Sequence, residues 1–270
     1  MIKIDCLEFI EKLRSKYDLT KAANLVVFNV GHNSASELYI KSKCAEAAKW
    51  NINVDVRQLD ESVTTDELKE MILKANIDNN VHGIIVQLPL PKHIDQETVL
   101  NSIRDIKNVD GFKQANKPTL FTPCTPLGIM TLLNDLTLLE GKMVTLLGRG
   151  RTVGEPLRDL LINANATVAI CHSKTTEEDR DSLLGLSDIV ISAVGIPNLF
   201  SQTDLNPRTI VIDAGISRVD GKQVGDFSHK GIDTRDDIRY TGWTGGVGKL
   251  TVAALMINTR KAMEKFCNEI

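Results

Sequence analysis

A strand, a glycine-rich loop and a helix follow one another at residues 142–163, and no other stretch constrains the fold as strongly. The apolar run KMVTLLG at 142–148 predicts a buried strand, and GRGRTVGEP at 148–156 opens the helix behind it. Glycines placed this way allow a tight turn and let backbone N–H groups approach a phosphate at a helix N-terminus. The stretch predicts a Rossmann-like dinucleotide site, and a glycine turn that binds nothing is the alternative.

Further apolar runs predict more strands, with amphipathic helical patterns between them. These runs are NLVVFNV (24–30), INVDVRQ (52–58), HGIIVQ (82–87), ATVAIC (166–171), DIVISAVG (188–195) and TIVIDAG (209–215). Strands that alternate with helices indicate an α/β fold with parallel sheets. We predict two domains, an α/β substrate domain formed by 1–122 with the closing helix 250–270, and a Rossmann-like NAD(P)-binding domain formed by 123–249.

The residues after the strand at 166–171 bear on which nucleotide is bound. In NAD sites an acid about 20 residues beyond the glycine loop binds the ribose hydroxyls, but here the strand leads into Ser173 and Lys174 with no carboxylate. The four residues Arg149, Arg151, Ser173 and Lys174 could instead bind a 2′-phosphate, because a guanidinium and a phosphate form a bidentate pair. We therefore expect NADP, with NAD the less favoured cofactor.

Charge and composition exclude several other classes of protein. The net charge is −3 without a basic block, which argues against a nucleic-acid surface or an anionic membrane as partner. The first residues resemble neither a signal nor a transit peptide, and no window approaches the roughly 18 apolar residues of a membrane span. The five cysteines are scattered and lack C-x-x-C spacing. We expect a cytoplasmic protein with reduced thiols and no metal site.

Two further features lie in the first half of the chain. In SELYIKSK (36–43), Tyr39 and Lys43 share one face if the segment is helical, which makes a candidate proton-handling pair. The alternatives are an ordinary amphipathic helix and the short-chain dehydrogenase signature, which is disfavoured because the glycine loop follows the pair here. Gln87 directly precedes LPLP, where two prolines end the strand, and open α/β sheets bind ligands at such carboxyl ends.

An ordered set of motifs covers nearly the whole chain. They are S-x-x-Y-x-x-x-K (Ser36, Tyr39, Lys43), GIIVQLPLP (83–91), VDGF (109–112), PCTPLG (123–128), GR-x-x-x-VG-x-P (148–156), CHSKT (171–175) and GGVG-x-x-T (245–251). Together they resemble the methylenetetrahydrofolate dehydrogenase/cyclohydrolase family. That resemblance implies a cytoplasmic, homodimeric enzyme of one-carbon metabolism and purine biosynthesis. It would oxidise 5,10-methylenetetrahydrofolate with NADP and hydrolyse the methenyl product to 10-formyltetrahydrofolate.

The resemblance also implies roles for individual residues. Lys43 would be the acid and base of the hydrolysis, Gln87 would hold it, Tyr39 would line the folate site and Asp110 would bind the pterin. The implied substrate-binding set is Tyr39, Lys43, Val86, Gln87, Leu88, Asp110, Gly245 and Gly246. The implied cofactor-binding set is Thr125, Gly148, Arg149, Gly150, Gly154, Ser173, Ile216, Gly246, Val247 and Gly248.

The sequence departs from the family pattern at two places. Gly150 stands where a serine is usual, and prolines are replaced at Gly242, Thr244 and Lys249. Without those prolines the loop should be looser unless Trp243 packs as an anchor; a mobile cover is the other interpretation of that side chain. Two alternatives for the whole protein remain, an enzyme with only one of the two activities and a catalytically silent dinucleotide-binding protein.

Overall fold

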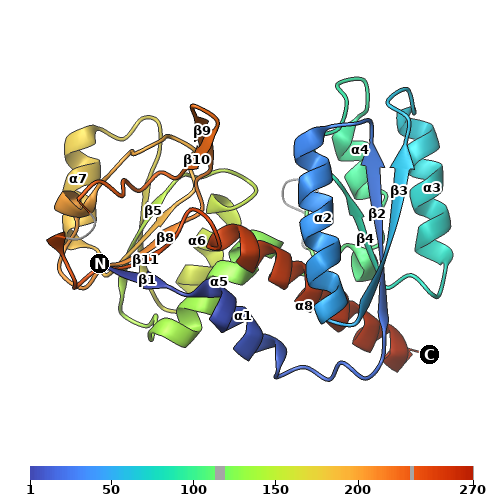
Figure 1. Cartoon of the computed structure of the whole chain (residues 1–270), viewed down its shortest axis with the longest axis horizontal. Coiled ribbons are helices and arrows are strands. Elements are labelled where there is room, and N and C mark those ends of the chain that lie inside the picture. The colour runs from blue at the N-terminus through green and yellow to red at the C-terminus, as the bar shows by residue number, and fades with distance from the viewer. Residues whose placement is uncertain (113–118, 232–233, 270) are drawn as a thin grey trace. The chain divides into compact units, whose positions relative to one another are not determined.

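The computed structural model describes residues 1–112, 119–231 and 234–269, apart from the side chains of residues 35 and 267–269 (Figure 1). The chain forms two compact units. We call them the three-stranded unit, which contains Arg14–Cys124 and Val252–Ile270, and the six-stranded unit, which contains Met1–Leu13 and Thr125–Thr251. The predicted fold class, two α/β domains with parallel sheets, is confirmed.

The three-stranded unit is a β-α-β-α-β arrangement with further short helices. Its elements are β2 (Ala23–Val30), α2 (Ser34–Lys49), β3 (Ile52–Leu59), α3 (Thr65–Ile77), β4 (Gly83–Val86), α4 (Gln96–Asn101) and the 3-10 helix η1 (Asp105–Lys107). All its strands are parallel in the order β3-β2-β4. Because the right-handed crossover from β2 to β3 and the one from β3 to β4 run in opposite directions across the sheet, α2 and α3 cover opposite faces (Figure 1). The continuous apolar run of β2 is thereby buried on both sides.

The six-stranded unit is a parallel sheet in the order β1-β11-β8-β7-β5-β6. Its elements are β1 (Ile2–Ile4), α1 (Cys6–Arg14), α5 (Cys124–Leu136), β5 (Met143–Leu147), α6 (Gly154–Asn163), β6 (Thr167–Cys171), α7 (Glu177–Leu186), β7 (Ile189–Ser192), η2 (Gln202–Asp204), β8 (Ile210–Asp213), β9 (Ser217–Val219), β10 (Lys222–Val224), β11 (Arg239–Thr241) and the start of α8 (Val247–Glu269). After β5 the chain moves to β6 on one side and then to β7 on the other. The carboxyl ends of β5 and β7 therefore form the topological switch point where such sheets bind ligands.

The first residues differ from the sequence-based grouping. We expected 1–122 to fold together, but Met1–Leu13 belongs to the six-stranded unit. The reason is pairing: β1 lies parallel to β11, and Ile2 N donates to Ile238 O at 2.7 Å. A strand of three residues is too short to show a periodic pattern, so it could be found only from its partner.

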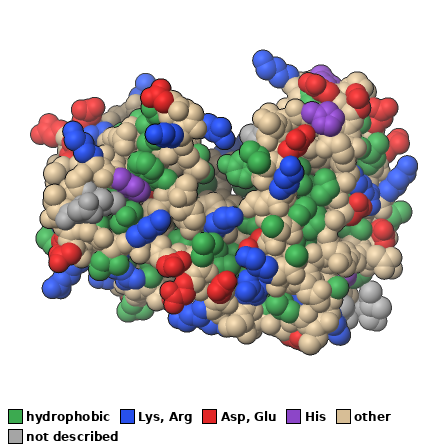
Figure 2. Space-filling model, viewed as in Figure 1, with side chains coloured by type: hydrophobic (Ala, Val, Ile, Leu, Met, Phe, Trp, Pro, Cys, Tyr) green, Lys and Arg blue, Asp and Glu red, His purple; other side chains and the backbone are tan. Residues whose placement is uncertain are grey.

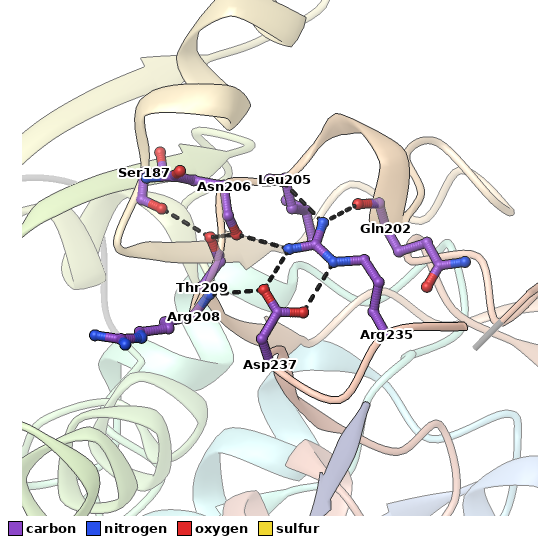
Figure 3. A network of polar contacts seen from close by, with 8 residues as sticks. All are labelled: Ser187, Gln202, Leu205, Asn206, Arg208, Thr209, Arg235 and Asp237. Carbon is purple, nitrogen blue, oxygen red and sulfur yellow. Dashed lines mark hydrogen bonds and ion pairs between the residues drawn. The ribbon is translucent and has the colours of Figure 1, made fainter. Parts of the chain in front are cut away.

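A polar network fixes the loops that lead into β8 and β11 (Figure 3). The Arg235 guanidinium donates to the carbonyls of Gln202 and Leu205 at 2.8 and 3.0 Å and pairs with the Asp237 carboxylate at 2.6 Å. Hydrogen bonds from Arg235 lower the pKa of Asp237 to about 2. These contacts lie at the amino ends of the strands, so they stabilise the edge of the sheet opposite the switch point.

On the face drawn in Figure 2, basic and acidic side chains are interspersed rather than gathered by sign. Among the helices of the described residues, none has the length and apolar character that crossing a membrane requires.

Candidate active site

Lys43 and Gln87 meet in the three-stranded unit. Helix α2 carries Lys43, and Gln87 follows the last residue of β4, where its N–H still donates to Phe28 O at 2.8 Å. The Lys43 ammonium donates to Gln87 Oε1 at 2.9 Å, and Gln87 Nε2 donates to Leu88 O at 2.7 Å. The buried amide is thus fixed at both ends, and it orients the lysine without placing a carboxylate against it.

Asp110 lies close enough to Lys43 for their charges to interact. Burial raises the pKa of the Asp110 carboxyl, while the charge of Lys43 and a hydrogen bond from the Cys124 thiol oppose that rise. Burial and the Asp110 carboxyl raise the pKa of Cys124 well above its ordinary value, so this cysteine remains a neutral thiol. The group consists of one lysine, one carboxyl and two neutral polar side chains.

The VDGF and PCTP motifs hold Asp110 in place. Gly111 has φ +76°, and a Cβ there would lie 2.7 Å from Phe121 O, so only glycine fits the turn. From α8, the buried Asn258 amide donates to the carbonyls of Val109 and Thr122, both at 2.9 Å. Sequence reasoning missed Asn258 and the thiol of Cys124. The available signal was an asparagine within the otherwise apolar TVAALMINT stretch of the closing helix.

The other predicted substrate residues are divided between the two units. Tyr39 lies one helical turn before Lys43 and is 51% exposed, so its ring is free to cover a ligand. Val86 is buried in β4, and Leu88 follows Gln87 as a partly exposed residue. Gly245 and Gly246 belong to the six-stranded unit.

The glycine loop after β5 has the geometry that a dinucleotide phosphate requires. Gly148 has φ +106°, and a Cβ there would lie 2.9 Å from Ala193 O. Gly154 starts α6 and packs against the Gly148 carbonyl, so a side chain has no room there either. Gly150 is different, because nothing lies within 4 Å of the position of its Cβ. The loop therefore leaves open space in front of a helix N-terminus.

The remaining cofactor candidates lie in the same unit. Arg149 and Ser173 follow β5 and β6 and are exposed, and Ile216 after β8 is 48% exposed. These positions suit a nucleotide with a phosphate on its ribose, because a guanidinium and a hydroxyl are both available to donate. The other predicted cofactor residues of this unit form a second group, Thr125, Gly246, Val247 and Gly248. In that group the Val247 side chain is buried, and the Thr125 hydroxyl lies 3.0 Å from the Thr251 hydroxyl.

Trp243 is an anchor of the loop that lacks the family's prolines. Its ring stacks on His229 with centroids 3.9 Å apart and planes at 11°, and its Nε1 donates to Phe227 O at 3.2 Å. Gln223 Nε2 donates to the Trp243 carbonyl at 3.0 Å. At Gly242 a Cβ would lie 2.5 Å from Lys3 Cε, so the Lys3 side chain of β1 would have to move to admit a larger residue there.

In the part of the chain that the structure describes, no three His, Cys, Asp or Glu side chains gather as metal ligands would.

Both parts of the chain match models of one known protein family. Residues 2–110 match the family model "Tetrahydrofolate dehydrogenase/cyclohydrolase, catalytic domain", and residues 123–267 match the NAD(P)-binding domain of the same family. The chain is 41% identical to the bifunctional protein FolD of Macrococcus caseolyticus over 249 residues, which cover 90% of this chain and 87% of that protein.

Solved structures of proteins from the same family are similar to this chain over nearly its whole length. The crystal structure of FolD, a methylenetetrahydrofolate dehydrogenase/cyclohydrolase from Campylobacter jejuni, has a TM-score of 0.87 and 36% identity, covering 98% of this chain and 99% of that one. The Trypanosoma brucei dehydrogenase-cyclohydrolase, solved with NADP and an inhibitor, has a TM-score of 0.82 and 31% identity, covering 96% and 92%.

Proposed function

The chain belongs to the tetrahydrofolate dehydrogenase/cyclohydrolase family, and from this membership we propose that it oxidises 5,10-methylenetetrahydrofolate with NADP and hydrolyses the methenyl product to 10-formyltetrahydrofolate. The observation that carries the proposal is the hydrogen bond between Lys43 and Gln87 beside the Asp110 carboxyl. The hydrolysis needs a proton carrier and a group that binds the folate. A lysine oriented by a neutral amide can serve as the first, and a nearby carboxyl as the second.

In the hydrolysis Lys43 is the proton carrier. Water attacks the methenyl carbon and forms a C–O bond, and the attacking water loses a proton to the neutral amine of Lys43. The ammonium then returns the proton to N5 as the C–N5 bond of the adduct breaks, and the hydroxyl of the adduct releases its remaining proton to solvent as the formyl C=O bond forms. Gln87 keeps the amine in line for both transfers, because its amide oxygen accepts from nitrogen in either charge state.

Asp110 serves substrate binding in this proposal. The amino-pyrimidine ring of a pterin presents neighbouring N–H groups, and a carboxylate accepts two such donors in one plane. Asp110 is partly buried, and this strengthens the pairing, since water competes less there. Tyr39, with its exposed ring, covers the folate from helix α2. The contributions of Val86, Leu88, Gly245 and Gly246 are part of the same proposal.

The oxidation needs correct placement and no strong base, because hydride loss leaves a cation shared by two nitrogens. NADP, when bound, accepts that hydride. The residues that bind it are the glycine loop of Gly148, Gly150 and Gly154, with Arg149 and Ser173 as donors to the 2′-phosphate. Ile216, Thr125 and the start of α8 at Gly246–Gly248 complete the set.

Three finer features belong to the proposal. The protein acts in the cytoplasm, supplies one-carbon units for purine biosynthesis and works as a homodimer. The functional division is a folate domain of 1–122 with 250–270 and an NADP domain of 123–249, with the first strand contributed to the sheet of the latter. Sedimentation velocity at micromolar concentration tests the dimer, and a single monomer boundary would contradict it.

A spectrophotometric assay tests the function. Methylenetetrahydrofolate is supplied with NADP or with NAD, while reduced nicotinamide and methenyl absorbance are followed together. We expect NADPH to form with little lasting methenyl signal, because the second reaction consumes it. Accumulating methenylfolate would mean a dehydrogenase alone, and hydrolysis of added methenylfolate without NADPH formation would mean a hydrolase alone. Nucleotide binding without either turnover would support a silent protein.

A further inference from the structure

One buried carboxylate in the six-stranded unit has no part in the chemistry described so far. Asp226 is fully buried after β10, and it accepts four hydrogen bonds. Oδ2 accepts from Ser192 Oγ at 2.6 Å, Val194 N at 2.9 Å and Gly195 N at 3.3 Å, while Oδ1 accepts from Ile196 N at 2.8 Å. All four donors are neutral, and they belong to the end of β7 and the loop that follows it.

The loop that Asp226 holds lies against the glycine loop. Gly148 packs so closely on Ala193 that a Cβ would lie 2.9 Å from its carbonyl, and the next nearest side chain belongs to Val194. On the other side, Ser217 Oγ donates to Gly195 O at 2.8 Å. The 193–196 loop thus connects the phosphate-binding turn after β5 with the segment after β8 that contains Ile216.

A second carboxylate fixes Asp226 in turn. Asp213, at the end of β8, accepts from Phe227 N at 3.0 Å, from Asp226 N at 3.3 Å and from Gly215 N at 3.0 Å. Each carboxyl packs against a glycine close in sequence to the other acid. A Cβ at Gly215 would overlap the Asp226 carboxyl, and a Cβ at Gly225 would overlap the Asp213 carboxyl. The position of Asp226 is therefore determined by backbone contacts on both sides.

Successive backbone N–H groups that converge on one point form an anion-binding nest. In the 194–196 loop that nest is filled by the protein's own carboxylate. An anionic ligand is thereby kept out of this loop, whereas the glycine loop is left open at Gly150. The same hydrogen bonds fix the backbone that presents Val194 and Ile196, which are 39% and 49% exposed, beside Ile216 at the switch-point edge.

We propose that Asp226 is a positioning residue of the dinucleotide site: it fills the amide nest after β7, directs the cofactor phosphates to the glycine loop, and fixes the apolar side chains that contact a cofactor ring. This proposal rests on the proposed function for the identity of the dinucleotide. Asp226 touches neither substrate nor cofactor and acts through the loop.

The test compares Asp226→Asn with the parent enzyme. The amide has the same shape, but it supplies only one acceptor oxygen to four donors, so the loop loses its fixed form. We expect at least a tenfold rise in both the KM and the equilibrium dissociation constant for NADP. Hydrolysis of added methenylfolate without nucleotide should stay within twofold. Asp237→Asn is the matched control, because it removes a carboxylate from the same unit at the Arg235 network, and its NADP constants should stay within twofold.

An unchanged NADP affinity in Asp226→Asn would overturn the proposal, as would an equal loss of methenylfolate hydrolysis in a variant whose helical circular dichroism is intact. If that variant does not fold, Ser192→Ala decides, because it removes one of the four bonds with little change in volume. A severalfold rise in the NADP dissociation constant supports the role of Asp226, and no rise refutes it. Binding is measured without turnover, so failure of the proposed function, seen as NADP binding without oxidation in the parent protein, is a separate result.

Discussion

The Lys43 ammonium donates to Gln87 Oε1 at 2.9 Å, and this hydrogen bond joins helix α2 to the residue that follows strand β4. Because this lysine carries the proton in the proposed hydrolysis, Lys43→Met should lower methenylfolate hydrolysis by about 10²- to 10⁴-fold, the usual contribution of an acid–base group. NADPH formation should continue and methenylfolate should accumulate. The measurement is the decay of methenyl absorbance.

Lys41→Met is the control for this experiment. Lys41 is exposed on the same helix, but two residues away it points to another face. Its hydrolysis rate should match that of the parent protein. Undiminished hydrolysis in Lys43→Met, with the fold intact by circular dichroism, would remove Lys43 from the mechanism.

Adding a side chain at Gly150 tests the predicted phosphate site. Nothing lies within 4 Å of a Cβ at this position, and its φ lies outside the left-handed region, so serine fits without strain. A hydroxyl there would reach a bound 2′-phosphate, and a hydrogen bond to a charged group contributes about 1.5 kcal/mol at the low end. Gly150→Ser should therefore lower the KM for NADP by about tenfold and leave the KM for NAD nearly unchanged.

Gly185→Ser is the matched control for the added hydroxyl. Gly185 lies in α7, its φ is also outside the left-handed region, and the nearest atom to its Cβ is 3.9 Å away. Its NADP constants should be those of the parent. Equal improvement for NADP and NAD in Gly150→Ser would show that the serine does not reach the 2′-phosphate.

Local sequence determined much of this structure. The apolar run before GRGRTVGEP located the glycine loop, the two prolines after Gln87 located the end of β4, and the i, i+4 spacing put Tyr39 and Lys43 on one helix. These features depend on neighbours in the chain, so a pattern could reveal them. The fold class followed from the same alternation of strands and helices.

The features that could not be predicted depend on partners far away in the sequence. β1 is a strand because β11 pairs with it more than two hundred residues later. Asn258 acts on the carbonyls of Val109 and Thr122, and Asp226 on the loop at 193–196. A single polar residue in an apolar helix or an acid in a turn has many local explanations. Only the three-dimensional contact selects among them.

Trp243 provides a test of what replaces the family's prolines. The indole stacks on His229 and donates to Phe227 O, so Trp243→Leu removes both contacts. Because the ring is only partly buried, we expect a loss of about 2 kcal/mol in unfolding free energy, below the 3–5 kcal/mol of a core aromatic. Amide exchange at 244–248 should accelerate, since the loop loses its anchor.

Trp50→Phe is the control for Trp243. Trp50 is fully buried in the three-stranded unit and donates to Glu46 at 3.0 Å, so its replacement should lower stability without changing exchange at 244–248. If exchange in that loop accelerates equally in both variants, Trp243 is not a specific anchor.

Asp213 gives a prediction for pH dependence. Burial, with the nearby Asp226, raises the pKa of this carboxyl from 3.8 to about 6 in the folded protein. The folded state therefore holds the proton more tightly than the unfolded state. The resulting stabilisation is complete below pH 3.8 and is lost as pH rises to about 6, a change of about 3 kcal/mol at 1.36 kcal/mol per pKa unit.

Asp213→Asn removes this titration. The variant loses hydrogen bonds to Gly215 and Phe227, which lowers its stability by an amount that does not depend on pH. Its deficit against the parent should therefore shrink by about 2 kcal/mol between pH 4 and pH 7 in urea unfolding. Asp237→Asn is the control: the pKa of Asp237 is lowered to about 2, so its difference from the parent should be nearly constant above pH 5. A constant deficit for Asp213→Asn across the same range would show that Asp213 does not titrate between pH 4 and 7.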